Sequence, residues 1–217
     1  MQNYKELLVV LGCLCVSALL LTAMSPRDQA LALTCQNHLR SLRDAAALYE
    51  KEHDGNIVPV KTTLNKKYQT WAGILLPYVS DVSIYYCPAD LPHGSKALER
   101  VDLIPTVYRG DTISYGMNYF LGDVQKSRKP RNYNINLVDT PEKIIFFGDS
   151  QTPFLRPTQA CWQLDFAPFH AKTSSCFVFV DGHTGILSGA TLGIIGRPDG
   201  FENWQIDDSS WHNWKKE

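Results

Sequence analysis

The spacing of hydrophobic and polar residues changes twice along the chain. Residues 7–24 read LLVVLGCLCVSALLLTAM and contain no charged side chain. A run of about 18 apolar residues is close to the shortest helix that crosses a bilayer, so we predict a transmembrane helix over 7–24 and a short cytoplasmic segment over 1–6. A secretory signal cleaved near Ala30 or Ala32 is the alternative. The run is longer than the apolar part of such signals, which favours an uncleaved anchor.

Apolar residues then recur at every third or fourth position, the spacing of a helix with one buried face. The recurring positions are Leu31, Cys35, Leu39, Leu42, Ala46 and Tyr49, with Gln36, Arg40, Arg43 and Lys51 on other faces. We predict an amphipathic helix over 28–54, with Asp28 as N-cap and Gly55 ending it in the left-handed conformation. With residues 7–24 it would form one rod bent at Pro26. Two separate helices are the alternative, because proline interrupts helical hydrogen bonding.

From residue 55 onward the pattern consists of short runs separated by glycine and proline. Residues 71–79 (WAGILLPYV) predict a helix or an extended segment broken at Pro77, and residues 83–87 (SIYYC) predict a β-rich run. Three further runs, at 114–121, 143–147 and 176–180, predict strands, the last two apolar enough to be fully buried.

The dipeptide Asp181-Gly182 follows the last of these runs and predicts a type I′ hairpin turn. The predicted fold class is therefore α+β. A long N-terminal helix, with its first half in the membrane, would pack on a small, mainly antiparallel sheet in a head over 55–190. A tryptophan-rich tail over 191–217 would follow the head.

Composition narrows the classes of function. The chain of 217 residues has 21 basic and 22 acidic side chains and a net charge of -1. This balance lacks the positive charge that binds a phosphate backbone, so no nucleic-acid partner is predicted. Fourteen glycines and 12 prolines are typical of a loop-rich, β-containing body and disfavour an all-helical fold.

Six segments occur in an order that one bacterial family shares. They read ELLVVLGCLCVSALLL, CQNHLRSLRDAAALYEKEHDGNIVP, YYCPAD, SYGMNYFLGD, IIFFGDS, and FH followed by FVFVDGH. Up to about Leu187 the chain resembles the bacterial type IV prepilin-like proteins (type II secretion G-like pseudopilins), in the branch with a prepilin-type N-terminal segment and a processing-associated H-X9-DG domain. The resemblance implies a pilin-like fold and a non-enzymatic subunit or accessory of a type II secretion or pilus-like assembly.

The same resemblance implies where the protein is and what it meets. It implies a single-pass protein of the bacterial inner membrane, with the N-terminus cytoplasmic and the head periplasmic or extracellular. Its partners would be pilin-like subunits or the secretion machinery. An unprocessed, membrane-anchored binding protein for a saccharide or protein is the alternative.

Glu6 stands where the family has a glutamate thought to pair with the terminal amine of a neighbouring subunit and set the register of the filament. A carboxylate favoured at a helix start is the alternative reading of Glu6. The glycine that precedes the family's processing site is missing, since Met1 and Gln2 occupy these positions. The cleavage and N-methylation that the resemblance implies thus lack their usual recognition residue.

The histidine and the Asp-Gly pair of the family correspond to His170 and Asp181-Gly182. Ten residues, 171–180, separate them, one more than in the family signature. Because a shift of one residue reverses the face of a strand, a bulge or a displaced His170 must absorb the difference.

Six cysteines are present, two of them in the apolar run at 7–24. The other four, Cys35, Cys87, Cys161 and Cys176, form an even set that has three possible pairings in an oxidising compartment. We favour Cys35–Cys87, which would pin the helix to the edge of the sheet, together with Cys161–Cys176. No CxxC pair is present, so a structural zinc site is not predicted.

A metal-dependent hydrolase is a further hypothesis, because His170, Asp149, Asp181 and His183 could converge on a divalent ion, with Ser150 beside Asp149. There is no HExxH, GxSxG or P-loop segment in the chain. Turn and strand-end roles explain each of these residues, including binding of backbone amides by Asp149. We therefore predict no catalytic residues and no enzyme.

The C-terminal tail offers two weaker hypotheses. Hard oxygen ligands for calcium are available at Asp199, Glu202, Asp207 and Asp208, although their spacing matches no defined calcium loop. An aromatic surface for a saccharide or a protein partner could form from Trp204, Trp211 and Trp214. Packing of these rings over the sheet is the alternative.

Overall fold

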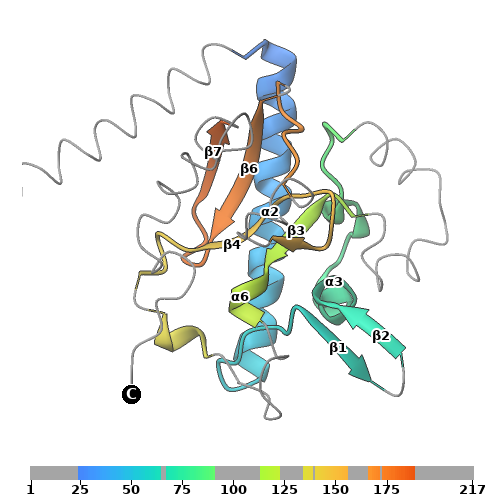
Figure 1. The fold of residues 1–217 in the computed structure, drawn as a ribbon, viewed down its shortest axis with the longest axis vertical. Coiled ribbons are helices and arrows are strands. Elements are labelled where there is room, and N and C mark those ends of the chain that lie inside the picture. Colours follow the sequence, from blue (N-terminus) through green and yellow to red (C-terminus); the bar gives the residue numbers. More distant parts are fainter. Residues whose placement is uncertain are drawn as a thin grey trace, which may run out of the picture.

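The computed structural model describes residues 24–64, 67–90, 113–122, 134–138, 140–155, 166–171 and 173–188. Within them one long helix, α2 (Pro26–Glu52), packs lengthwise on a mixed sheet of five strands (Figure 1). The strands of this sheet are β3 (Tyr115–Asn118), β4 (Ile145–Asp149), β5 (Phe154–Leu155), β6 (Ser174–Phe179) and β7 (Thr184–Ser188). A two-stranded antiparallel sheet of β1 (Lys61–Leu64) and β2 (Lys67–Thr70) lies near the C-terminal end of α2. The predicted α+β class is confirmed.

The start of α2 is set by Ser25 and Pro26. The Ser25 side chain accepts a hydrogen bond from the Asp28 backbone N–H at 3.2 Å and donates one to the Asp28 carboxylate at 2.7 Å. Proline at the first helical position has no N–H to satisfy, so it begins the helix without cost. The N-cap prediction for Asp28 is therefore wrong by three residues. The helix ends at Glu52, and Gly55, three residues later, has the predicted left-handed conformation with a φ of +80°.

One face of α2 packs into the core. The apolar residues buried on this face are Ala32, Cys35, Leu39, Leu42, Ala45 and Ala46. Arg43 is also buried, contrary to its prediction on another face. Its Nε donates to the Val180 carbonyl at 2.9 Å, its Nη1 lies 3.0 Å from Glu50, and its guanidinium lies over the Phe146 ring. These partners compensate the buried charge of the Arg43 guanidinium, which the apolar spacing had placed on the solvent side of the helix.

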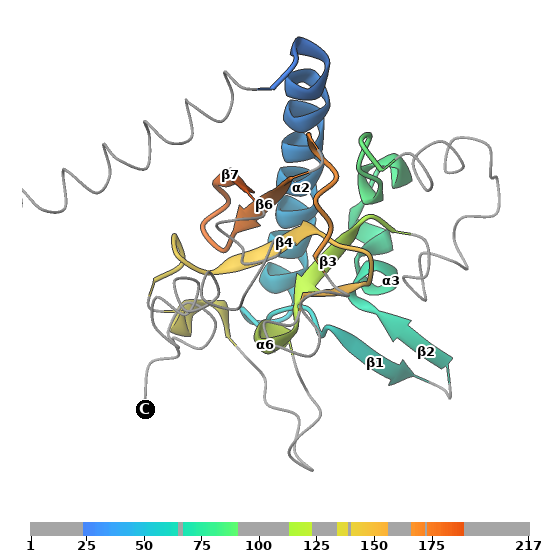
Figure 2. The same cartoon turned by 45° about the horizontal axis from the view of Figure 1, so that its top comes forward.

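The five strands follow the order β5-β3-β4-β6-β7, in which only the β3–β5 pairing is parallel. Figure 2 shows β3, β4, β6 and β7 of this sheet packed beside α2. A bulge shifts the register of β4 against β6 between Ile145 and Phe147. The predicted hairpin between β6 and β7 is confirmed, but its type I′ turn is wrong. Only Gly182, and not Asp181, has positive φ, and its N–H donates to the Phe179 carbonyl at 3.0 Å. The loop therefore consists of the three residues 180–182, and the third of them, Gly182, has the left-handed conformation.

Short helices replace part of the extended structure that the sequence predicted. They are α3 (Trp71–Leu75), η1 (Leu76–Tyr78), η2 (Val82–Tyr85), α6 (Tyr119–Gly122) and η3 (Ile135–Leu137). The segment 83–87 was predicted to be β-rich, yet most of it is in η2. The Asp81 carboxylate accepts bonds from the backbone N–H of Ser83 at 2.8 Å and from its hydroxyl at 2.6 Å, which holds the first turn in helical form.

Among the described residues no helix combines the length and the apolar character needed to cross a bilayer. The one long helix there, α2, carries the exposed charged residues Arg40, Asp44 and Lys51, which hydrocarbon would not accommodate. The predicted localisation as a single-pass inner-membrane protein is therefore corrected. Residues 7–23 of the predicted span, and with them the rod that was to join it to α2, lie outside the described residues.

Candidate functional site

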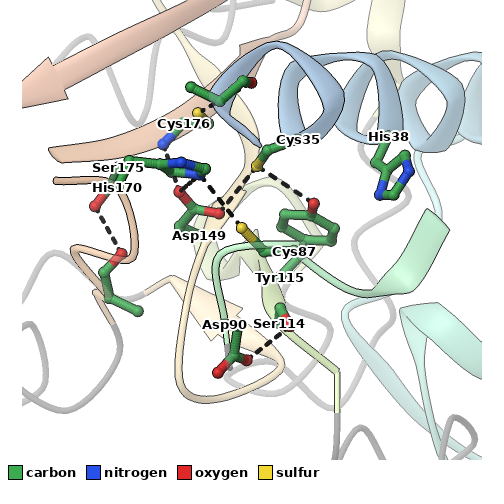
Figure 3. A network of polar contacts seen from close by, with 12 residues as sticks. Cys35, His38, Cys87, Asp90, Ser114, Tyr115, Asp149, His170, Ser175 and Cys176 are labelled. Atoms are coloured by element: carbon green, nitrogen blue, oxygen red, sulfur yellow. Dashed lines mark hydrogen bonds and ion pairs between the residues drawn. The ribbon is translucent and has the colours of Figure 1, made fainter. Parts of the chain in front are cut away.

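A cluster of five ionisable side chains is buried between α2 and the sheet (Figure 3). Its members, hereafter the buried cluster, are Cys35, Cys87, Asp149, His170 and Cys176, each at most 1% exposed. Cys35 comes from the buried face of α2, Asp149 ends β4, and Cys176 lies in β6, the neighbour of β4. The cluster therefore joins the helix to the two central strands on which it packs.

Asp149 is at the centre of the buried cluster. Its Oδ2 accepts a hydrogen bond from the Cys176 backbone N–H at 2.6 Å, and its Oδ1 accepts one from the Cys35 thiol at 3.3 Å. This confirms the expected role of Asp149 in binding a backbone amide. Burial raises the pKa of Asp149 to about 8, although the hydrogen bonds from Cys176 and Cys35 lower it.

His170 lies beside Asp149, with its Nε2 3.4 Å from Oδ2. Two backbone hydrogen bonds of 2.9 Å join His170 to Ser174, and Ala171 in the turn between them has a φ of 48°. Burial lowers the pKa of His170 to about 4, so the imidazole is neutral at pH 7 and does not form an ion pair with the carboxyl. No described residue forms a hydrogen bond with the buried Nδ1 of His170.

The three described cysteines are free, buried thiols. Tyr115 donates a hydrogen bond to Cys35 Sγ at 3.3 Å, and Cys176 Sγ donates to the Ala32 carbonyl at 3.7 Å. Cys87 Sγ lies 3.3 Å from His170 Nε2. The predicted Cys35–Cys87 disulfide is therefore not formed. The predicted partner of Cys176, Cys161, lies outside the described residues.

The thiols are held in their protonated form by their surroundings. Burial raises the pKa of Cys35 and of Cys87, and the negative charge of Asp149 adds to this effect. For Cys176 the contact with Cys35 lowers the pKa, but burial and Asp149 outweigh it and raise the value to about 11. A protonated, buried thiol is a poor nucleophile, so in this form the cluster is chemically inert.

Four ligand atoms of the cluster are close enough to share one metal ion. Those of Cys35, Asp149, His170 and Cys176 all lie within 4.8 Å of one another. Two thiols, an imidazole and a carboxyl form a donor set suited to zinc and similar transition metals. Because every member is buried, such an ion would have no open position for a substrate.

The structure divides the four residues of the hydrolase hypothesis into two pairs. His170 meets Asp149 at the start of β6, whereas Asp181 meets His183 at the β6–β7 turn, with 2.6 Å between Oδ1 and Nδ1. The two ends of β6 are about 20 Å apart at ~3.3 Å per residue. Ser150 donates its hydroxyl to the Phe154 carbonyl. The four side chains of the hydrolase hypothesis therefore do not converge on one point.

Among the other predicted site residues, Gly182 makes the hairpin turn beside Asp181. The rest lie outside the described residues: Met1, Gln2, Glu6, Asp199, Glu202, Trp204, Asp207, Asp208, Trp211 and Trp214.

The sequence analysis singled out the members of the buried cluster, but it did not predict that they lie close together in space. Cys35 was placed on the apolar face of the helix, and Asp149 and Cys176 at the ends of apolar runs. Residues at such positions are buried when a helix packs on a sheet. The missing signal is strand order, since β4 and β6 are neighbours in space but not in sequence.

Comparison with known proteins gives no match: no protein-family model, no curated protein and no solved structure is similar to this chain.

Proposed function

We propose that the chain is a non-catalytic, pilin-like subunit that assembles with further copies of itself through the outer face of α2. The observation that carries the proposal is the exposure of two large apolar side chains on this face. Leu33 is 61% exposed and Leu48 is 52% exposed, while the opposite face of the same helix is fully buried.

Several of the exposed residues between these leucines are small. The two leucines are 15 positions apart, which corresponds to about 22 Å along the helix axis. Small side chains, at Thr34, Ser41 and Ala47, are exposed between them. Two helices approach to 8–10 Å where the contact residues are small. The outer face of α2 therefore offers two apolar anchors on either side of a stretch in which small side chains alternate with the exposed charges Arg40 and Asp44.

Two further observations support a role without catalysis. The ionisable side chains of the buried cluster have no contact with solvent, so no substrate reaches them in this conformation. The order of six sequence segments resembles that of a family whose members act by assembly. A helix packed along a largely antiparallel sheet is compatible with that resemblance.

The test is the oligomeric state of the full chain, measured by sedimentation velocity over a range of concentrations. We expect reversible self-association in the wild type and its loss in the double variant Leu33→Glu/Leu48→Glu. Burial of one leucine contributes about 1.5–3 kcal/mol, so each removed contact weakens association by at least ~10-fold.

Lys143→Glu is the matched control, because Lys143 is exposed in the turn before β4 and the substitution changes the net charge by the same two units. We expect this control to associate like the wild type. A wild type that remains monomeric at every concentration would overturn the proposal. So would a double variant that associates as strongly as the control.

A further inference from the structure

We propose that Cys35, Asp149, His170 and Cys176 bind one Zn²⁺ ion as a closed, four-coordinate structural centre. This site is independent of the self-association proposed above. It rests on the geometry of the four side chains, on the donors around them and on the elements that supply them.

The distances between the ligand atoms fit a tetrahedral ion with small adjustments. Zinc bonds of about 2.3 Å to sulfur and 2.0–2.2 Å to nitrogen or oxygen place neighbouring ligand atoms about 3.4–3.8 Å apart. His170 Nε2 is 3.4 Å from Asp149 Oδ2, and Cys35 Sγ is 3.3 Å from the other carboxylate oxygen, Oδ1, so the carboxylate has to turn to present one oxygen to the ion. The whole set lies within 4.8 Å, so the longest separation has to shorten by about 1 Å.

The side chains around the four ligands donate hydrogen bonds toward atoms that would carry negative charge. Tyr115 donates to Cys35 Sγ, and the Cys176 backbone N–H donates to Asp149 Oδ2. Two thiolates and a carboxylate around Zn²⁺ leave one net negative charge, which such donors stabilise in a buried site. Binding therefore requires that Cys35, Cys176 and any protonated Asp149 each lose a proton, and these protons leave the site as the metal enters.

One buried polar atom of the cluster has no partner among the described residues. Nδ1 of His170 has no hydrogen-bond partner in the described part of the chain, and Nε2 faces a thiol and a carboxyl at 3.3 and 3.4 Å. Buried polar groups are costly unless they are paired or coordinate a metal. A zinc ion would bind Nε2 together with both sulfur atoms and one carboxylate oxygen, while Nδ1 would keep no partner among the described residues.

The four ligands come from elements that are far apart in sequence. Cys35 is in α2, Asp149 ends β4, His170 precedes β6 and Cys176 is in β6. An ion at this position would cross-link the helix to the two central strands. The role of zinc is therefore structural: it holds α2 on the sheet.

The experiment measures the zinc content of the purified full chain, kept reduced, by mass spectrometry of the metal. We expect about one zinc ion per chain in the wild type and at least ~10-fold less in Cys35→Ser and Cys176→Ser. His183→Ala is the matched control for His170→Ala. His183 also contacts an aspartate, Asp181, but is exposed in a turn, so we expect His183→Ala to keep its zinc and His170→Ala to lose it.

Cys87→Ser tests the composition of the ligand set, because Cys87 Sγ also lies 3.3 Å from His170. We expect this variant to retain zinc and Asp149→Asn to lose it. Loss of zinc from Cys87→Ser with retention in Asp149→Asn would overturn the proposed set.

A measurement on the wild type alone covers the case in which the variants do not fold. Removal of zinc with a chelator should lower the midpoint of thermal unfolding, and added zinc should restore it. Replacement by Co²⁺ should give the visible bands of a tetrahedral ion and thiolate-to-cobalt charge-transfer absorption. A wild type that contains no zinc and gives no such bands with Co²⁺ would refute the site.

Discussion

Gly148 in β4 directly precedes Asp149, and its lack of a side chain makes room for Phe177 in β6. A Cβ atom at this position would lie 2.2 Å from Phe177 Cδ1 and 2.5 Å from Cε1. Phe177 is fully buried, and its ring also contacts Phe166. Since ordinary contacts begin at 3.4 Å, Gly148→Ala forces the ring to move by about 1 Å or more in a close-packed interior.

The size of the effect follows from two opposing contributions. Overpacking of a core costs about 1–3 kcal/mol, while alanine in a strand is more favourable than glycine by about 0.5–1 kcal/mol. The clash at Gly148 is with a buried aromatic ring, so we place the cost at the upper end. We expect a loss of about 2–2.5 kcal/mol in the free energy of unfolding, which lowers the melting midpoint by about 4–10 °C in a domain of this size.

Urea unfolding of a double-mutant cycle measures this coupling directly. Phe177→Ala alone should cost about 3–5 kcal/mol, since it removes a buried ring. In the Phe177→Ala background the addition of Gly148→Ala should cost nothing or be slightly stabilising, because the clashing atoms are gone. Gly185→Ala in β7 is the matched control. Its Cβ would meet only Phe179 Cε2, at the ordinary distance of 3.6 Å, so it should be neutral or stabilising.

Two outcomes would refute this reasoning. One is that Gly148→Ala is tolerated as well as Gly185→Ala. The other is that its cost stays the same with and without the Phe177 ring.

Three further substitutions each remove a buried or capping polar group. Arg43→Met leaves Glu50 buried without its cation and should cost about 3–5 kcal/mol at pH 7. Burial already raises the pKa of Glu50, so denaturant unfolding near pH 5, where the carboxyl takes up a proton more readily, should show a smaller loss. Asp81→Ala should cost about 0.5–1 kcal/mol near neutral pH, at the low end for caps because the carboxylate is exposed. The bonds from the Ser83 hydroxyl and backbone N–H hold the pKa of Asp81 below its usual value, so this difference should vanish as pH falls through the lowered pKa in an acid titration of stability. Tyr115→Phe removes the donor to Cys35 Sγ and should weaken zinc binding by about 10-fold in a competition titration with a chromogenic chelator.

The elements that follow from local pattern were predictable from the sequence. The recurrence of apolar residues placed α2 within two residues of its observed ends, and the two most apolar runs became β4 and β6. Each of these signals depends on residues that are close together in the chain, which is why a spacing rule detects it.

The errors arise where a single polar side chain overrides the pattern. Arg43 is buried because its partners, the Val180 carbonyl and the Phe146 ring, come from the sheet. Residues 83–87 are rich in β-forming side chains, yet hydrogen bonds between Asp81 and Ser83 hold most of them in helical form. The conformational propensities of single residues carry no information about such side-chain contacts.

The buried cluster could be predicted only in parts. The sequence placed Cys35 on the apolar face of the helix, Cys176 in a buried strand and Asp149 at the end of another strand. Cys35 and Cys176 meet only because α2 packs across β4 and β6. The spacing of the ligands along the chain does not reveal that α2 crosses β4 and β6. The absence of a CxxC pair also argued against a metal site.

The position of α2 ahead of its partner strands in the chain has a consequence for synthesis. The helix packs against β4, β6 and β7, so the ribosome completes α2 before it has made any strand of that platform. At 5–20 residues per second, the stretch from Glu52 to Ser188 takes about 7–27 s to translate. During that interval the apolar stripe of Leu39, Leu42 and Ala46 has no sheet to cover it. Chaperones that bind amphipathic segments therefore have a defined window on the nascent chain, which closes when β6 and β7 emerge.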